Sequence, residues 1–341
     1  MKKVTMQDIA DALNISRVSV WKVFTGRPGV SPALRNQIIA KALEMNYALP
    51  SDLRAEANEK HEALKKTIAI AVSSPETSVF WINLIHEIAK EASAHNANIM
   101  YTYLPKEIDS TYTLPSFLTD GTVNGMIVLN VYDDALIKML ASLNLPKVFM
   151  DTSTTIPFAQ LNGDLLLIEG RSSVAQITES IIAQGKKRIG FIGDIKYAQT
   201  NFERYYGFKS AMKEHGISVE SDYCLTGPIG ADTYKEEIER FLNKLAPLPD
   251  AFICVSDFVA NIVCNSLVTK GIQIPKDIMV SGFDEQADLS FPTPLTTVRV
   301  NSVTFGCKLA RQILYRLECP NAGRELIYVS PEVVLRESTK L

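Results

Sequence analysis

Long apolar runs are missing from this 341-residue chain, and no stretch approaches the 18 uninterrupted apolar residues that would predict a membrane span. No secretory signal is recognisable either, because an acidic residue, Asp8, arrives before any apolar run. Cysteine is scarce, and its spacing forms neither a CxxC pair nor a zinc site, so free thiols are expected. The five cysteines are Cys224, Cys254, Cys264, Cys307 and Cys319. We therefore expect a cytoplasmic protein without a membrane partner, metal or cofactor.

The charge is unevenly distributed along the chain. Residues 1–47 contain seven basic and three acidic residues, a formal charge of +4, whereas the whole chain carries −3. The remaining 294 residues therefore carry −7. A basic head on an acidic body indicates that the head, and not the body, meets a polyanion. With 46% hydrophobic and 21% charged residues, the chain is long enough for about two globular domains.

The basic head has the pattern of three short helices. Thr5, Ser16 and Ser31 are each followed by helically spaced apolar residues, and a Thr or Ser side chain is a favourable helix N-cap. Two short helices joined by a tight turn and braced by a third form a helix-turn-helix, whose second helix enters the major groove of DNA. A three-helix bundle with a solvated basic face is the alternative that periodicity alone leaves open.

On the second predicted helix, 16–24, the apolar stripe leaves four side chains facing outward: Arg17, Val18, Trp21 and Lys22. Arg17 and Lys22 are suited to guanine O6 and N7, and Val18 to a thymine methyl group. Short hydroxyl side chains are suited to phosphate oxygens, which fix register rather than sequence. The candidates of this kind are Thr5, Ser16, Ser19 and Ser31.

From Thr67 onward, short apolar runs alternate with amphipathic segments. This alternation predicts an α/β fold of parallel sheets with helices on both faces, arranged as two lobes of similar build. The predicted strands are 68–72, 99–103, 126–129, 148–150, 189–192, 252–255 and 278–280. The predicted helices include 81–95, 172–184, 204–215, 234–245 and 258–270.

Polar residues follow several of these strands, at the edge where α/β sheets bind ligands. They are Ser73, Asp151, Asp194, Asp257 and Asp284. Repeated aspartates at strand ends favour a ligand rich in hydroxyl groups, because one carboxylate accepts from two neighbouring OH groups. A strand-end aspartate is also a frequent helix N-cap, so each of these positions keeps a structural alternative.

Four short segments of the head form a recognisable pattern: Val4–Ala10, Ile15–Val20, Gly29–Ser31 and Asn46–Tyr47. In their order, spacing and N-terminal position they resemble the LacI/GalR family of bacterial transcription regulators. The resemblance implies that Arg17, Val18 and Lys22 occupy base-reading positions. Trp21 departs from the family pattern, which has a small serine there; an indole would stack on a sugar or phosphate edge or reshape the docking.

The resemblance continues through the body and implies a fold similar to periplasmic sugar-binding proteins, two lobes joined by three crossovers. The body motifs are 188–193, 203–208, 249–257, 278–284 and 294–298. Arg204 and Asp284 stand where family members grip an effector, and Ser256 replaces a common asparagine. Phe80 and Trp81 are suited either to stacking on a sugar or to core packing.

Residues 48–66 separate the head, 1–47, from the effector-binding and dimerisation body, 67–341. The resemblance implies a hinge helix here that folds on DNA and wedges a leucine into the minor groove. This chain has Ala57 where that leucine is expected, which leaves Leu53 as a substitute, or a weaker bend in the DNA. A flexible tether is the plainer interpretation.

Together these features predict a transcription regulator, a repressor by the family's commonest behaviour, that binds a pseudo-palindromic operator as a homodimer. A small effector, a sugar or sugar derivative, is expected between the lobes. No apolar heptad follows Val333–Leu335, which favours a dimer over a tetramer. The alternatives are a periplasmic-type sugar-binding protein and a sugar-modifying enzyme. Catalysis has little support, because the sequence contains no GxxxxGK[ST], GxSxG or complete GxGxxG motif.

Overall fold

The computed structural model divides the chain into two compact units, Met1–Lys66 and Thr67–Leu341, which are considered separately. Within them the structure describes residues 4–45, 47–50, 53, 66–75, 79–230, 233–286 and 290–340. Of the predicted hinge segment, 48–66, the structure describes only residues 48–50, 53 and 66, so Ala57 lies outside the described residues.

The first unit contains the three predicted helices: α1 (Met6–Ala12), α2 (Arg17–Phe24) and α3 (Pro32–Glu44). Each begins at its predicted cap, since the hydroxyls of Thr5, Ser16 and Ser31 accept hydrogen bonds from backbone N–H groups of the first turn. The apolar stripes of the helices meet in one small core, which includes Ile9, Val20, Val23, Phe24 and Ile38.

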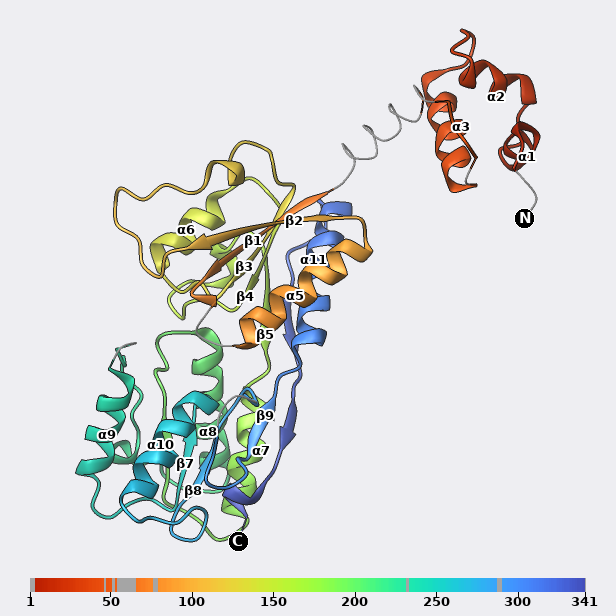
Figure 1. Ribbon diagram of the computed structural model, residues 1–341. Coiled ribbons are helices and arrows are strands. Elements are labelled where there is room, and N and C mark those ends of the chain that lie inside the picture. The colour runs from red at the N-terminus through yellow and green to blue at the C-terminus, as the bar shows by residue number, and fades with distance from the viewer. Residues whose placement is uncertain are drawn as a thin grey trace. The chain divides into compact units, whose positions relative to one another are not determined.

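The first lobe of the second unit is built on a six-stranded parallel sheet with the order β10-β5-β4-β3-β1-β2 (Figure 1). Its strands are β1 (Thr67–Ser73), β2 (Asn98–Leu104), β3 (Gly125–Leu129), β4 (Lys147–Met150), β5 (Asp164–Ile168) and β10 (Leu326–Val329). Its helices are α5 (Val79–Ala94), α6 (Asp134–Ser142) and α11 (Ser302–Glu318).

Both faces of this sheet are buried, as the apolar strands predicted. Ile68, Ile70 and Val72 of β1 belong to one core cluster together with residues of α5 and α11. The alternate residues Ala69 and Ala71 belong to a second cluster with residues of α6. Because successive side chains of a strand point to opposite faces, helices cover the sheet on both sides.

The second lobe has a three-stranded parallel sheet, β6-β7-β8, and an antiparallel pair, β9 with β11. The strands are β6 (Ile189–Ile192), β7 (Ala251–Cys254), β8 (Met279–Ser281), β9 (Thr297–Arg299) and β11 (Glu332–Val334). The helices are α7 (Arg171–Ile182), α8 (Gln199–Glu214), α9 (Tyr234–Lys244) and α10 (Asp257–Thr269).

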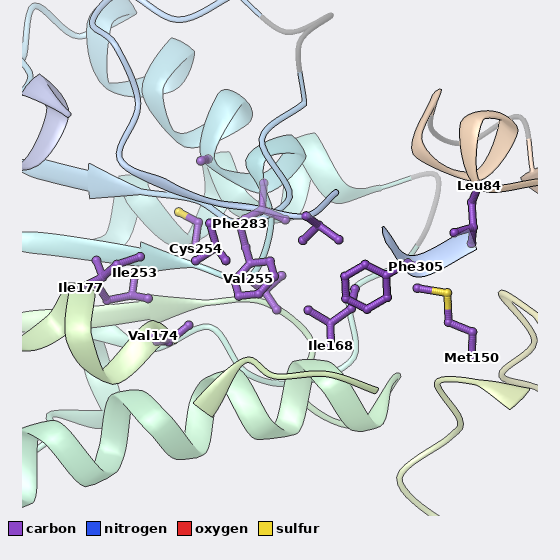
Figure 2. Packing of buried hydrophobic residues seen from close by; sticks show 14 of the residues in the cluster. Leu84, Met150, Ile168, Val174, Ile177, Ile253, Cys254, Val255, Phe283 and Phe305 are labelled. Atoms are coloured by element: carbon purple, nitrogen blue, oxygen red, sulfur yellow. The ribbon is translucent and has the colours of Figure 1, made fainter. Parts of the chain in front are cut away.

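The chain passes between the lobes three times, at 168–171, 299–302 and 329–332, which confirms the expected crossovers. One apolar core extends across these crossings and contains residues of both lobes. Figure 2 shows Val255 and Phe283 of the second lobe continuing through Ile168 and Phe305 toward Met150 of the first. The predicted two-lobed α/β fold is therefore confirmed, with β5, β9, β10, β11, α6 and α11 as elements that the sequence patterns did not single out.

Candidate functional site

The outward face of α2 is the first candidate site, and it is oriented as the periodicity predicted. Val20, Val23 and Phe24 are buried, whereas the side chains of Arg17, Val18 and Trp21 are exposed and Lys22 is half-buried. Val18 and Trp21 are 59% and 43% exposed, which is unusual for apolar side chains on so short a helix. This face thus presents one apolar, one aromatic and two cationic side chains, a set that suits base edges and the DNA backbone.

The hydroxyl groups predicted to meet phosphates all lie at helix starts or in the first turn. Thr5 accepts from the Asp8 backbone N–H and donates to the Asp8 carboxylate at 2.7 Å. The Ser16 oxygen accepts from the Ser19 backbone N–H at 3.2 Å and lies 3.0 Å from the Ser19 hydroxyl. Ser31 accepts from the Leu34 N–H at 3.3 Å. These hydrogen bonds order the first turns of the helices. Contact of the same hydroxyl groups with phosphate stays a prediction.

Leu53 lies in the core of the head. Its side chain is only 6% exposed and packs in the same cluster as Leu49 and Val20. Insertion of this leucine between DNA bases would therefore first require it to leave a packed apolar environment.

The second candidate site is a cleft of about 670 Å³ between the lobes of the body. Eight of the nine candidate ligand-binding residues line it: Ser73, Phe80, Trp81, Asp151, Asp194, Arg204, Ser256 and Asp284. Ser73 ends β1 and Asp151 follows β4, while Ser256 follows β7 and Asp284 lies shortly after β8. Strand ends from both sheets thus converge on one space, as expected for parallel α/β lobes.

Asp151 has a carboxylate that is fully engaged with protein donors. One oxygen accepts from the backbone N–H groups of Thr152 and Thr200, at 2.8 and 3.2 Å. The other accepts from the Tyr132 hydroxyl at 3.0 Å and the Thr200 hydroxyl at 2.5 Å. Burial raises the pKa of Asp151, and these hydrogen bonds oppose that rise. The carboxylate therefore joins the first lobe to the start of α8 in the second.

Arg204 and Asp284 form the charged centre of the second lobe's side of the cleft. The Arg204 guanidinium donates to the Val255 carbonyl at 2.6 Å and lies 3.4 Å from the Asp284 carboxylate. It also stacks on the Phe283 ring at 3.6 Å. Burial raises the pKa of Asp284 to about 6, although the nearby guanidinium lowers it. The Arg204 Nε is buried and has no hydrogen-bond partner among the described residues.

Asp257 is the one predicted effector residue that does not line the cleft. Its carboxylate accepts from the Thr297 hydroxyl at 2.6 Å and from the Gln286 backbone N–H at 2.9 Å. Burial raises its pKa to about 7, and the neighbouring Asp284 charge adds to that rise. The side chain thus holds β9 and the 284–286 segment in place. Ser256 lines the cleft but also caps α10, since it accepts from the Val259 N–H at 3.3 Å.

Aromatic side chains supply much of the cleft wall, and sequence reasoning found only two of them, Phe80 and Trp81. The others are Tyr132, Tyr197, Tyr234 and Phe258. The Tyr132 and Tyr197 rings, one from each lobe, lie 4.4 Å apart. Burial raises the pKa of Tyr234 to about 12, so its hydroxyl stays a neutral donor at physiological pH. Tyr132 follows the end of β3, and an inspection of that strand end would have found it.

The cleft is acidic overall. Its described lining includes four carboxylates and two cations: Lys106, Glu107, Asp151, Asp194, Arg204 and Asp284. Asp151 and Asp284 are poorly solvated because of burial, which raises the pKa of each, so a further negative charge would be unfavourable here. Polar walls with aromatic faces and net negative charge favour a neutral, hydroxyl-bearing ligand.

Among the described residues, the structure contains no apolar helix of the length that a membrane span requires.

A family model described as a periplasmic binding protein-like domain matches residues 178–339. Two curated relatives are HTH-type transcriptional repressors PurR. That of Mannheimia succiniciproducens is 25% identical over 339 residues, and that of Photobacterium profundum is 26% identical over 344 residues. Each alignment covers 98% of both chains.

Among solved structures, a transcriptional regulator CelR–cellobiose complex matches with a TM-score of 0.70 and 20% identity, covering 98% of this chain and 100% of that one. A Lac repressor dimer bound to operator and the anti-inducer ONPF matches with a TM-score of 0.67 and 20% identity, covering 99% of each chain. The fold, the exposed helix-turn-helix face and the full-length relatives define a DNA-binding transcription regulator. The PurR relatives and these structural neighbours support a transcription regulator of the LacI/GalR family.

Proposed function

We propose that this regulator is a repressor that binds a pseudo-palindromic operator as a homodimer in the cytoplasm, and that a neutral carbohydrate in the interlobe cleft controls it. The observation that carries the proposal is the cleft itself, about 670 Å³ in volume, with aromatic faces and strand-end polar groups from both lobes. Pockets of this size enclose a small ligand almost completely. The protein then acts by binding, without a reaction of its own.

The chemistry of the lining supports a carbohydrate. Phe80 and Trp81 offer apolar faces for the CH surface of a sugar ring, and the Asp284 carboxylate and the Arg204 guanidinium, which both line the cleft, offer an acceptor and a donor for hydroxyl groups. The net negative charge disfavours a sugar phosphate. Cellobiose is bound in the CelR complex, which makes neutral sugars the first class to test.

The proposed conformational change acts on contacts between the two lobes. The Asp151–Thr200 hydrogen bonds and the Tyr132–Tyr197 ring contact both join the two lobes beside the cleft. A ligand that prefers a more closed or more rotated arrangement would strengthen or break these contacts, and it shifts the equilibrium only by its differential affinity for the two states. Such a motion would change how two linkers, 48–66, meet in a dimer and hence the affinity for DNA.

On DNA, the domain division is a head of 1–47, a hinge of 48–66 and an effector-binding body of 67–341. Arg17, Val18 and Lys22 read base edges, and Trp21 packs on the backbone. The hydroxyls of Thr5, Ser16, Ser19 and Ser31 contact phosphates. The Lac repressor dimer on its operator supports the two-fold arrangement, because two heads then meet successive major grooves.

The first experiment is selection of bound DNA from a random pool by the purified protein, followed by sequencing. An enriched inverted repeat supports the dimeric regulator, and its release by individual neutral sugars identifies the effector. Release by sugar phosphates or by planar nucleobases alone would refute the carbohydrate assignment. If no sequence is enriched with or without these ligands, the operator proposal fails, and incubation with sugars tests for a product as the enzyme alternative.

Two substitutions test the DNA-binding face and the interlobe cleft independently. Arg17→Ala should relax specificity at one base position and cost about 1–3 kcal/mol of operator binding; uniform weakening on all sequences would make Arg17 a phosphate contact instead. Arg204→Met should abolish release by the effector while sparing operator binding, because the side chain lies in the body and lines the cleft. An unchanged effector titration would refute the role of Arg204.

A further inference from the structure

A second cavity, of about 490 Å³, lies in the first lobe away from the interlobe cleft. Its walls are residues 141–147 from the end of α6 to the start of β4, Asn162–Gly163 just before β5, and the end of α11 with the segment that follows it. In a parallel sheet the strand starts share one edge, so Lys147 and Gly163 lie at the edge where β1 begins at Thr67. The effector cleft lies at the opposite ends of the same strands.

Three cationic side chains line this cavity, Lys147, Arg316 and Arg324, and none of its described lining residues is acidic. Arg316 is neutralised from behind by Asp164, whose two oxygens each lie 2.6 Å from a guanidinium nitrogen. No described carboxylate forms an ion pair with Lys147 or Arg324. The cavity therefore keeps two cations without a counter-ion of their own.

Lys147 is held in an unusual position for a lysine, with only 2% of its surface exposed. Its ammonium donates to the Ala141 and Leu143 carbonyls at 2.9 and 2.6 Å, at the end of α6. Gly163 makes room for it, because a Cβ there would lie 2.4 Å from the Lys147 Cγ. Burial lowers the pKa of Lys147 to about 8, and the Arg324 charge adds to this effect. A bound anion would relieve both influences.

Arg324 has donors left for a ligand. Its Nη1 donates to the Ala159 carbonyl at 3.2 Å and to the Asn162 side chain at 3.0 Å, which fixes the guanidinium plane at the cavity. Its Nε and Nη2 make no hydrogen bond within the described part of the chain. A planar guanidinium with free donors, near enough to the Lys147 ammonium for its charge to lower the pKa of that lysine, matches the oxygens of a phosphate or carboxylate group.

We propose that this cavity binds a small metabolite carrying a phosphate or carboxylate group, at a site distinct from the effector cleft. Arg324 contacts the oxyanion directly, Lys147 neutralises it from the cavity floor, and the remaining volume accommodates an organic portion larger than the anion itself. The carbonyls at the end of α6 do not repel the anion strongly, since Lys147 already bonds two of them. A ligand at this site would be a second small molecule that acts on the regulator, bound at the edge of the sheet where β1 begins.

The test uses the full-length chain and calorimetric titration at constant ionic strength. The probes are inorganic phosphate, glycerol 3-phosphate and succinate, with sodium chloride as the ionic control. We expect saturable binding of one anion per chain, and the comparison of phosphate with succinate assigns the preferred group. Glycerol 3-phosphate binding more tightly than inorganic phosphate would support an organic ligand.

Arg324→Gln should weaken binding about tenfold or more, because it removes a charge-assisted contact. Arg240→Gln is the matched control, with the same charge change at an exposed position on α9 in the other lobe, and should bind like the wild type. Lys147→Met provides a second loss of affinity. Wild-type affinity in Arg324→Gln, or no saturable binding of any probe, would overturn the proposal. Arg204→Met keeps anion binding, so this proposal and the carbohydrate proposal fail separately.

Discussion

Replacing Thr200 by valine removes a hydroxyl that joins the two lobes and leaves the side-chain shape nearly unchanged. The Thr200 hydroxyl donates to the Asp151 carboxylate at 2.5 Å, and both residues are buried. A hydrogen bond to a charged acceptor contributes about 1.5–3 kcal/mol. Because Asp151 keeps three other donors, we expect a loss near the lower half of that range, about 2 kcal/mol in the free energy of unfolding.

The chain provides its own probe for this measurement. It has two tryptophans, Trp21 in the head and Trp81 beside the cleft, so fluorescence in a Trp21→Phe background reports the body alone. Urea unfolding of Thr200→Val in that background gives the change in free energy, provided that the denaturant slope is unchanged.

Thr154→Val is the matched control, because its hydroxyl also crosses between the lobes, donating to the Lys196 carbonyl at 2.8 Å, but at an exposed position. It should change the free energy of unfolding by no more than about 0.5 kcal/mol. Equal effects of the two substitutions, or no effect of Thr200→Val, would refute the reasoning that the buried Asp151 bond is the stronger interlobe connection.

Three further predictions concern stability. Ser16→Ala should destabilise the head by about 0.5–2 kcal/mol through loss of the α2 cap, measured by Trp21 fluorescence in a Trp81→Phe background. Asp164→Asn should cost about 3–5 kcal/mol, because it leaves Arg316 buried without a full counter-charge, whereas the exposed Asp109→Asn gives a small change; equal losses would contradict this. The pKa of Asp257 is raised to about 7, so the folded state binds its proton more tightly and loses stability as pH rises from about 4 to 7. Asp257→Asn should therefore remove up to about 1.4 kcal/mol per pH unit from this decline in the free energy of unfolding. If the free energy of unfolding of the variant and of the wild type changed in parallel with pH, Asp257 would not be the cause of the decline.

Some elements escaped sequence reasoning for identifiable physical reasons. β5 begins with Asp164, and a charged residue is unexpected at the start of a buried strand; the structure supplies Arg316 as its partner from more than 150 residues away. α11 has Gly306 in its interior, which lowers helix propensity. In the fold this glycine permits close packing on α5, since a Cβ there would lie 2.7 Å from the Glu87 Cβ.

The candidate site was partly predictable for a related reason. Parallel strands end at a common edge, so polar residues after apolar runs identified four residues that line the cleft: Ser73, Asp151, Asp194 and Asp284. The same rule also selected Asp257, because a strand-end aspartate serves equally well to hold neighbouring backbone. Which of these roles applies depends on partners such as Thr297, 40 residues further along the chain.

The sequence by itself determined the local structure and the class of the protein. Caps at Thr5, Ser16 and Ser31 and apolar periodicity act over a few residues and predicted the head and the two lobes, and the resemblance of short motifs indicated the family. Only the tertiary structure decided which polar groups remain available to a ligand. The Asp151 carboxylate is saturated by donors from both lobes, and the two hydrogen bonds from Thr200 that complete the set come from 49 residues further along the chain.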